Sequence, residues 1–436
     1  RTYYKQCQSD CPPGATQVQL REHFHGNDRI AVPELTYQDS VGHVLRRQTW
    51  GFDGRAILVD QRYDNLGRLA QTDQARFSAD AAVLAQGQDW DVLDRVTATT
   101  TLDETGTPRT LSTAYQGMTL VSTNALQQKR TDKRDALGQL RQTVDDRGGL
   151  TQFGYDAFGN LNRTVDPNGN VVTVTFDDLG RKTELRDPDL GWIQYTVDPA
   201  GRTRRQVSPV QRSLGQNTTM EFDALDRMTA RLEPGLDSRW LYDSATKGVG
   251  QLAEAYTGPA AAKTYRRLHS YDALGRPGTT TLVLSDATYL QTPGFDLWAR
   301  PTTQTLQRGS AAAKVFTRRY NAYGYLSSLQ RTFPAPSLTL WQAAAQDAAQ
   351  RVTQATLGNG LLLSQGFNPS SARLSSRTLQ TAAGAPRLLQ AYAYDALGNV
   401  LQRSLQWDSA SFVENFSYDN LNRLASSQVL GQPLLS

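Results

Sequence analysis

The sequence predicts an all-β protein in which tandem antiparallel β-hairpins wind into a spiralling, hollow shell segment. Three observations in the 436 residues carry this expectation. A Tyr-Asp-x-Leu-Gly-Arg motif recurs along the chain, its copies follow at a regular step, and a second turn signal lies about halfway between copies. Such repeats are small units that cannot bury their apolar surface alone and therefore stack on their neighbours.

The motif sets a register for the whole chain. Taking its Asp position as the anchor, we find seventeen copies, 19 to 29 residues apart, with a step of 21 three times running between Asp135 and Asp198. The residue before the anchor is aromatic in fourteen of the seventeen copies, although aromatic residues make up only 9% of the chain. The anchors are Asp39, Asp64, Asp91, Gln116, Asp135, Asp156, Asp177, Asp198, Asp223, Asp243, Asp272, Asp296, Asn321, Gln342, Asn368, Asp395 and Asp419.

The residue types of the motif specify a tight turn. The anchor Asp can accept hydrogen bonds from backbone N–H groups further along the turn. The residue three positions later must be left-handed to close a three-residue hairpin loop with a bulge. That position is Gly in nine copies, and Asp94, Asp226 and Asn422 also tolerate positive φ. We expect distorted turns, or turns of another type, in the five copies that carry Thr119, Thr246, Ala299, Ala345 and Ser371.

The five clearest copies supply the candidate site residues, which we interpret as structural anchors of the repeat. The aromatic rings are expected to pack between adjacent hairpins, although an aromatic ladder could instead bind sugars. The structural anchors are Tyr63, Asp64, Gly67, Tyr155, Asp156, Gly159, Phe176, Asp177, Gly180, Tyr271, Asp272, Gly275, Tyr394, Asp395 and Gly398.

A second turn, the interposed turn, divides each repeat into strand, turn, strand, turn. Asp166-Pro167-Asn168-Gly169 is its clearest copy, because Pro suits the second turn position and Gly the fourth. The strand predicted over residues 170–176 alternates between apolar and Thr side chains. Residues 338–354 are rich in Ala and Gln, which suits either a helical excursion or a degenerate repeat. We favour the degenerate repeat because the anchor spacing holds across it.

The number of repeats predicts the overall shape. Seventeen repeats imply roughly thirty strands, and at ~4.8 Å between neighbours they form about 140 Å of hydrogen-bonded ladder. A barrel that its own side chains can fill closes at around eight strands, so a ladder this wide must wind on itself and enclose space. A stack of small sheets, as in a propeller, is the alternative, but no period of two repeats marks separate blades.

Composition excludes some functional classes and divides the chain. The net charge of +4 is spread along the sequence without basic blocks, which argues against a nucleic-acid surface. No apolar run approaches the ~18 residues that a transmembrane helix needs. Cys7 and Cys11 either form a small disulfide loop or stay free. We expect a segment of a longer protein, with a lead-in over residues 1–34, repeats over 35–430 and a truncated edge over 431–436.

The repeated Tyr-Asp-x-Leu-Gly-Arg copies, the 21-residue step and the Asp-Pro-x-Gly interposed turn resemble the Rhs/YD-repeat family. This family includes bacterial Rhs polymorphic toxins, the B and C components of insecticidal toxin complexes and the teneurin YD shell. The resemblance implies a non-catalytic, secreted or surface-exposed bacterial shell that encloses a C-terminal toxin or effector polypeptide and meets a delivery or secretion component. A cell-surface adhesion or carbohydrate-binding module is the alternative.

Searches for chemistry in the sequence yield no constellation, so we expect no enzyme, cofactor or metal site. His23 and His25 could place two imidazoles on one strand face, but no third ligand is apparent. The segment 166–170 looks like part of a calcium loop yet lacks the later Glu, and a turn explains it. Family members carry a self-cleavage block with an aspartate pair after the repeats, and no residue here matches it.

Overall fold

The computed structural model describes residues 1–8, 11–25, 28–29, 32–408 and 410–430. In these ranges the chain forms one antiparallel sheet of 37 strands, a separate two-stranded sheet (β3 with β4) and one short helix, α1 (Pro209–Ser213). The prediction of an all-β antiparallel fold is therefore confirmed. No helix in the described part of the chain has the length and apolar character to span a bilayer.

The strands of the first part are β1 (Thr2–Gln6), β2 (Gln17–Arg21), β3 (Phe24–His25), β4 (Asp28–Arg29), β5 (Glu34–Gln38), β6 (Val44–Trp50), β7 (Ala56–Tyr63), β8 (Leu69–Asp73), β9 (Arg76–Phe77), β10 (Leu84–Trp90), β11 (Val96–Leu102), β12 (Pro108–Gln116) and β13 (Thr119–Thr123). The middle strands are β14 (Lys129–Arg134), β15 (Leu140–Val144), β16 (Leu150–Tyr155), β17 (Leu161–Val165), β18 (Val171–Phe176), β19 (Lys182–Asp187), β20 (Gly191–Val197), β21 (Thr203–Val207), β22 (Thr218–Phe222), β23 (Met228–Glu233), β24 (Leu236–Tyr242), β25 (Leu252–Thr257) and β26 (Tyr265–Tyr271). The last strands are β27 (Pro277–Val283), β28 (Thr288–Phe295), β29 (Pro301–Arg308), β30 (Lys314–Tyr320), β31 (Leu326–Phe333), β32 (Leu338–Gln346), β33 (Val352–Leu357), β34 (Leu362–Phe367), β35 (Leu374–Gln380), β36 (Pro386–Tyr394), β37 (Val400–Trp407), β38 (Ala410–Tyr418) and β39 (Leu424–Val429).

The topology of the large sheet is a meander. From β5 onward each strand pairs with the next along the chain, except that β8 pairs with β10 while β9 returns to β7. Helix α1 lies in the connection between β21 and β22, which still pair with each other. Short hairpins therefore build an unbroken ladder, and its strands do not gather into separate blades.

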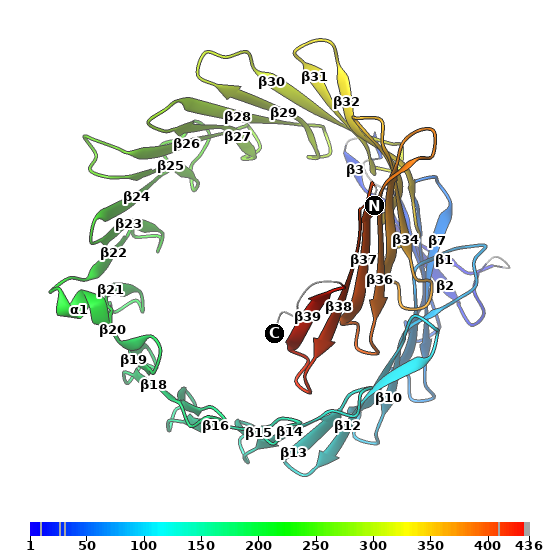
Figure 1. Cartoon of the computed structure of the whole chain (residues 1–436), viewed down its shortest axis with the longest axis horizontal. Helices are drawn as coiled ribbons and strands as arrows, with labels where there is room; N and C mark the ends of the chain where they lie inside the picture. The colour runs from blue at the N-terminus through cyan, green and yellow to red at the C-terminus, as the bar shows by residue number, and fades with distance from the viewer. Residues whose placement is uncertain (9–10, 26–27, 30–31, 409, 431–436) are drawn as a thin grey trace.

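The sheet curls until it meets itself. Figure 1 shows the strands running around a ring until the chain from β31 onward passes its own earlier strands again. The turn before β31 contacts the connection between β6 and β7, and the turn between β38 and β39 contacts the connection between β13 and β14. We call residues 1–320 the first lap and residues 321–430 the second lap. Hydrogen bonds between the laps join residues separated by 264 to 296 positions in the sequence. The predicted spiral is therefore confirmed, with one lap for about every 270 residues.

The wall of this ring is a single layer. The chain exposes 25273 Å², whereas a compact monomer of 48.2 kDa would expose about 16,500 Å². The hydrophobic cluster among the described residues contains only Ile57, Phe77 and Ala348, with Ala75 packed against it. The sheet thus lacks the second layer that normally buries an apolar face, and a hollow interior follows from that.

The anchor turns have the predicted backbone. All twelve residues expected at positive φ adopt it, including Asp94 (φ 58°), Asp226 (φ 62°) and Asn422 (φ 59°). In such a turn the N–H of the left-handed residue donates to the anchor carbonyl, as from Gly67 to Asp64 at 3.0 Å. The strand pairing shifts by one residue just before the anchor, for example between Arg62 and Tyr63. This is the bulge that a three-residue loop requires.

Three of the five copies expected to depart from this turn do so. The hairpin at Gln116 closes with a two-residue turn, the loop opened by Asp243 runs to Gln251, and the turn opened by Asn368 is one residue longer. In the last of these, Ala372 rather than Ser371 takes positive φ.

The expectation for Ala299 is wrong. Ala299 adopts φ 59° in an ordinary anchor turn, with its N–H donating to the carbonyl of Asp296. The Asp296 carboxylate accepts from the N–H groups of Trp298 and Arg300, both at 2.9 Å. These charge-assisted hydrogen bonds outweigh the ~1 kcal/mol that a left-handed alanine costs.

The anchor assigned at Gln342 is also wrong. Gln342 lies inside β32, and the turn opens five residues later at Asp347, whose N–H donates to the carbonyl of Arg351. Trp341 suggested the wrong register because the residue before the true anchor, Gln346, is not aromatic. Residues 338–346 form a strand, so the degenerate repeat is confirmed over the helical excursion.

The lead-in continues the same sheet. Cys7 and Cys11 form a disulfide with a Cα–Cα distance of 5.8 Å, which resolves the alternative that the spacing left open. Strand β1 pairs with β2, and β2 pairs with β5, so the ladder crosses the boundary predicted at residue 35. The edge predicted over residues 431–436 lies outside the described residues.

The turn at Ala299 gives a direct test of backbone strain. Ala299→Gly should raise the free energy of unfolding by roughly 0.5–1 kcal/mol, because glycine adopts positive φ without a steric penalty. The fluorescence of the neighbouring Trp298 during urea denaturation measures this. Gly275→Ala is the matched control, since φ is +73° there and nothing lies within 4 Å of the added Cβ. It should lower stability by a similar amount. Earlier unfolding of Ala299→Gly would contradict the strain account.

Candidate functional site

The repeat motif builds a local clasp around the anchor carboxylate. In the turn at Asp64, Oδ1 accepts from the backbone N–H groups of Leu66 and Arg68, both at 2.9 Å. Oδ2 accepts from Arg68 Nε at 2.7 Å. Both carboxylate oxygens of Asp64 thus accept hydrogen bonds from donors within residues 64–68. The interposed turn at Asp103 shares this geometry, since Asp103 Oδ1 accepts from the N–H groups of Thr105 and Thr107 at 2.9 Å.

The same clasp recurs at the other predicted anchors. Asp177 and Asp272 each accept from the Nε of the arginine four residues later, at 2.7 Å. At Asp156 and Asp395 an Asn side-chain amide replaces the guanidinium, with distances of 2.9 and 2.8 Å. The anchors are therefore interchangeable pieces of one local design. The anchors named here lie along the ladder from Asp64 to Asp395.

The clasp arginine also reaches the next repeat. Arg68 Nη1 donates to the backbone carbonyl of Asp91 at 2.6 Å, and its guanidinium lies 5.8 Å from the centroid of the Trp90 ring. Arg276 donates to the carbonyl of Asp296 at 3.4 Å and stacks on Phe295 at 4.7 Å. One guanidinium thus holds its own turn and, through a cation–π contact, the aromatic ring of the following turn.

The aromatic residue before the anchor binds back to the previous repeat. The Tyr63 hydroxyl donates to the carbonyl of Val44 at 3.2 Å, and Tyr155 donates to Leu140 at 3.0 Å. The same hydrogen bond links further pairs of repeats, from Tyr271 to Leu252 at 2.8 Å and from Tyr394 to Leu374 at 2.7 Å. These rings lie between adjacent hairpins.

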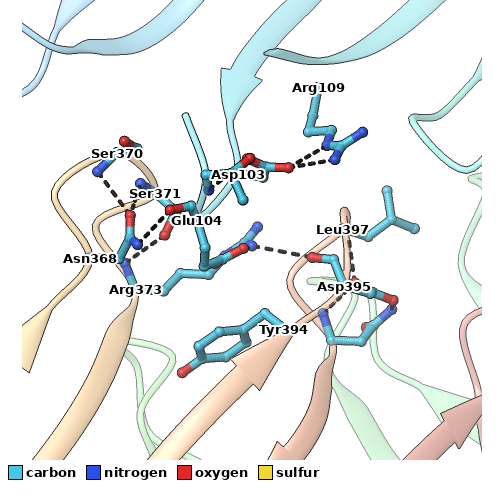
Figure 2. A network of polar contacts seen from close by, with 12 residues as sticks. Asp103, Glu104, Arg109, Asn368, Ser370, Ser371, Arg373, Tyr394, Asp395 and Leu397 are labelled. Atoms are coloured by element: carbon cyan, nitrogen blue, oxygen red, sulfur yellow. Dashed lines mark hydrogen bonds and ion pairs between the residues drawn. The ribbon is translucent and has the colours of Figure 1, made fainter. Parts of the chain in front are cut away.

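The contact between the two laps, which we call the seam, is the feature that brings distant residues together. Figure 2 shows its centre, where the turn at Asn368 meets the interposed turn at Asp103. Asn368 Nδ2 donates to the carbonyl of Glu104 at 2.8 Å, and Arg373 Nη1 lies 2.9 Å from Glu104 Oε1. Arg373 also reaches the Asp395 carbonyl at 3.5 Å, so it joins the seam to the repeat ladder.

The seam extends on both sides of this centre. Toward the N-terminal side, Asn321 Nδ2 donates to the carbonyl of Phe52 and the Tyr325 hydroxyl donates to that of Trp50, both at 2.7 Å. Toward the C-terminal side, Asn422 Nδ2 donates to Gln128 Oε1 at 2.8 Å.

At each of these three points an anchor turn of the second lap meets the first lap at, or directly beside, an interposed turn. The apolar cluster of Ile57, Phe77 and Ala348 fills part of the space between them.

The seam could hardly be predicted from the sequence. Its partners are far apart in the chain, and contact between them depends on the accumulated curvature of more than twenty strands. One signal was present: the anchor is Asn rather than Asp at residues 321 and 368, and neither has an arginine four residues later. We interpreted these copies only as variants of the motif.

Hydrogen bonds from arginine side chains and backbone N–H groups favour the ionised form of two anchor carboxylates. Burial opposes ionisation of Asp198, yet hydrogen bonds from the Arg202 N–H and from the guanidinium groups of Arg202 and Arg204 lower its pKa to about 2. The guanidinium of Arg423 and its backbone N–H lower the pKa of Asp419 to about 2 as well. The carboxylates at these two turns are thus charged at neutral pH and act as acceptors.

The described residues offer no metal cluster. No group of three or more His, Cys, Asp or Glu side chains is close enough to hold an ion in the part of the chain that the structure describes. The His25 side chain, one of the two candidate ligands, lies outside what is described. An open cavity of about 700 Å³ lies against β26 to β30, and its lining includes Arg267, His269 and Lys314 but no carboxylate.

Comparisons with known proteins bear on the motif and on the fold. The family model for the RHS Repeat matches residues 134–171, which include the anchors Asp135 and Asp156. Residues 134–171 therefore match an Rhs repeat. This confirms the resemblance that the Tyr-Asp motif indicated, whereas a search of the curated proteins finds no match.

Solved structures reproduce the curled sheet. The crystal structure of TcdB2-TccC3-TEV superposes with a TM-score of 0.77 at 16% identity, over 97% of this chain and 25% of that one. TcdB2-TccC3 without its hypervariable C-terminal region gives 0.77 at 16%, over 94% and 24%. A Photorhabdus luminescens Tc holotoxin pore gives 0.77 at 15%, over 95% and 24%. The chain thus spans about a quarter of the length of these structures and shares their fold.

The hydrogen bond from the aromatic residue can be tested at Tyr271. Tyr271→Phe should lower the free energy of unfolding by about 1–2 kcal/mol, because the carbonyl of Leu252 loses its donor in a half-buried site. Chemical denaturation measures the change. Tyr265→Phe is the control, since its ring contacts Arg267 at 5.8 Å and no hydrogen bond from its hydroxyl is seen in the described structure. Equal losses in the two variants would refute the role of the hydroxyl.

Acid should loosen the clasps. The folded-state pKa of Asp198, about 2, lies below the ordinary value of 3.8. The stability that this carboxylate contributes is therefore present above about pH 4 and is lost as the pH falls through about 2. Hydrogen exchange of the Arg202 N–H between pH 5 and 2 should show this loss. The turn that joins Leu357 to Leu361 has no anchor carboxylate and should keep its protection. Parallel losses in both turns would contradict the prediction.

Proposed function

We propose that this chain is a wall segment of a shell that encloses an effector polypeptide. The observation that carries the proposal is the seam, because it is where a curled sheet closes on itself. Two laps joined through side-chain hydrogen bonds and two ion pairs form a continuous wall around an interior. A sheet that only curved, without contact between its laps, would leave a gap through which a polypeptide could escape.

The dimensions of one lap suit a polypeptide cargo. Between the seam contacts of Trp50 and Tyr325 the ladder passes through β7, β8 and β10 to β30. At ~4.8 Å per strand these strands give a circumference of about 110 Å and a diameter of about 35 Å between backbones. This width exceeds that of a barrel filled by its own side chains. It accommodates an unfolded chain or one small domain.

Further features support a secreted, non-catalytic wall. The disulfide between Cys7 and Cys11 suits an oxidising compartment outside the cytosol. The motif carboxylates are engaged in turn clasps, so they act as structural groups rather than as acid–base pairs. By this proposal the whole protein would meet a delivery or secretion component, as its Tc-like fold suggests. Sugar binding is not proposed, because the rings that suggested it bind to neighbouring hairpins.

Protection of the cargo tests the shell. In the full-length protein that contains this chain, a non-specific protease should cleave the enclosed polypeptide at least tenfold more slowly than it cleaves the same polypeptide purified alone. The difference should vanish in a denaturant concentration that unfolds the sheet. Electron micrographs of the same sample should show hollow particles. Cleavage at equal rates, or a solid rod in the images, would exclude a shell.

A further inference from the structure

Among the anchor turns of the motif, two open with Asn, at Asn321 and Asn368, and both lie at the seam. An ordinary anchor carboxylate only accepts hydrogen bonds: Oδ1 accepts from two backbone N–H groups and Oδ2 accepts from a side chain four residues later. In Asn the second acceptor is replaced by an NH₂ group with two donors. An Asn anchor thus preserves the turn and presents a hydrogen-bond donor where Asp presents an acceptor.

The two Asn side chains use both ends of the amide. Asn321 Oδ1 accepts from the N–H groups of Tyr323 and Tyr325 at 3.0 Å, while Nδ2 donates across the seam to Phe52. Asn368 Oδ1 accepts from the N–H groups of Ser370 and Ser371 at 2.9 Å, while Nδ2 donates to Glu104. The inner oxygen keeps the turn closed and the outer nitrogen makes the contact between laps.

The two acceptors occupy equivalent positions. Phe52 and Glu104 are the second residues of interposed turns that begin at Gly51 and Asp103. The carbonyl of the first residue is already used, since Gly54 donates to Gly51 at 3.0 Å and Gly106 donates to Asp103 at 3.1 Å. The second carbonyl is left to accept from outside the turn. At each of these turns the first lap therefore presents a backbone carbonyl that accepts no hydrogen bond from within the turn.

The residue that would clasp an Asp anchor is redirected at the same two positions. A guanidinium cannot bind the NH₂ group of Asn, because both are donors. At Asn321 the residue four positions later is Tyr325, which donates to the carbonyl of Trp50. At Asn368 the following arginine is Arg373, which pairs with Glu104. In each Asn turn, the side chains of the anchor and of this following residue therefore both contact the first lap.

An Asp anchor at the seam meets a different partner. Asp419 lies 3.7 Å from Arg147 Nη1 of the first lap, so a cation faces the carboxylate there. At the two turns that face a carbonyl of the first lap the anchor is Asn, and at the turn that faces a guanidinium it is Asp. An Asp opposite the Phe52 or Glu104 carbonyl would place two acceptors about 2.8 Å apart with no hydrogen between them.

From these contacts we propose that Asn321 and Asn368 are the specificity-determining residues of the lap-to-lap interface. Their side-chain amides recognise the second-position carbonyls of the interposed turns and thereby fix which turn of the first lap each turn of the second lap meets. In the proposed shell, this recognition would determine where the two laps of the wall join.

The test replaces both amides by carboxylates. The double variant N321D/N368D should keep its anchor turns, since Asp opens most of the others, but it should lose the seam. Hydrogen exchange measured by mass spectrometry should show at least about tenfold faster exchange over residues 50–55 and 103–107 at pH 7.5. Exchange at the remote turn over residues 272–276 should not change, which shows that the sheet remains folded.

The matched control makes the reverse change away from the seam. D177N/D272N alters the same chemistry at two anchors whose carboxylates bind only their own turns in the described part of the chain. It should leave exchange over residues 50–55 and 103–107 unchanged. Unaltered protection at the seam in N321D/N368D would overturn the proposal, as would an equal loss in the control.

Hydrogen exchange at the seam can be measured whether or not the shell holds a polypeptide. If the seam opens in N321D/N368D while the polypeptide in the full-length protein stays protected, the Asn residues keep their role in the interface and the enclosing function fails instead.

Discussion

The fold depends on one constraint, which is that the carboxylate that opens an Asp-anchored turn must find hydrogen-bond donors for both of its oxygens. Two backbone N–H groups meet that need only when the chain reverses within five residues, so the carboxylate and the tight turn require each other. The remaining oxygen binds a guanidinium long enough to reach the next turn as well. The anchor therefore couples a local reversal to the position of the following repeat, and the ladder propagates from one such pair to the next.

This coupling explains how a sheet with almost no hydrophobic core holds together. In a two-layer domain, apolar burial between the layers would be the main stabilising term. Here the cluster of Ile57, Phe77 and Ala348 is small, and the repeats rely on backbone ladders, clasped turns and ring contacts between neighbours. Each repeat interacts mainly with the repeats on either side, as in other repeat proteins. The seam adds the long-range contacts that such an array otherwise lacks.

Much of the fold could be predicted because its determinants are local. Residue types that tolerate positive φ identified twelve turns, and the alternation of side chains identified strands. The turns at Ala299 and Gln342 were wrongly predicted because a single residue type was taken as sufficient in each case. Ala299 adopts the turn because the Asp296 carboxylate compensates for strain that residue type alone seemed to forbid. The aromatic Trp341 displaced the anchor from Asp347. The seam could not be predicted from local sequence patterns, since its partners meet only after the curvature of a full lap has accumulated.

The length of the lap has an evolutionary consequence. Because the turns at Asn321 and Asn368 face particular turns near Phe52 and Glu104, the number of hairpins in between is fixed by geometry. Duplication or deletion of a single hairpin inside the first lap would slide every later turn past its partner by one position. Gene segments in that interval should therefore vary in loop length far more readily than in hairpin number, whereas an open solenoid can gain or lose units freely.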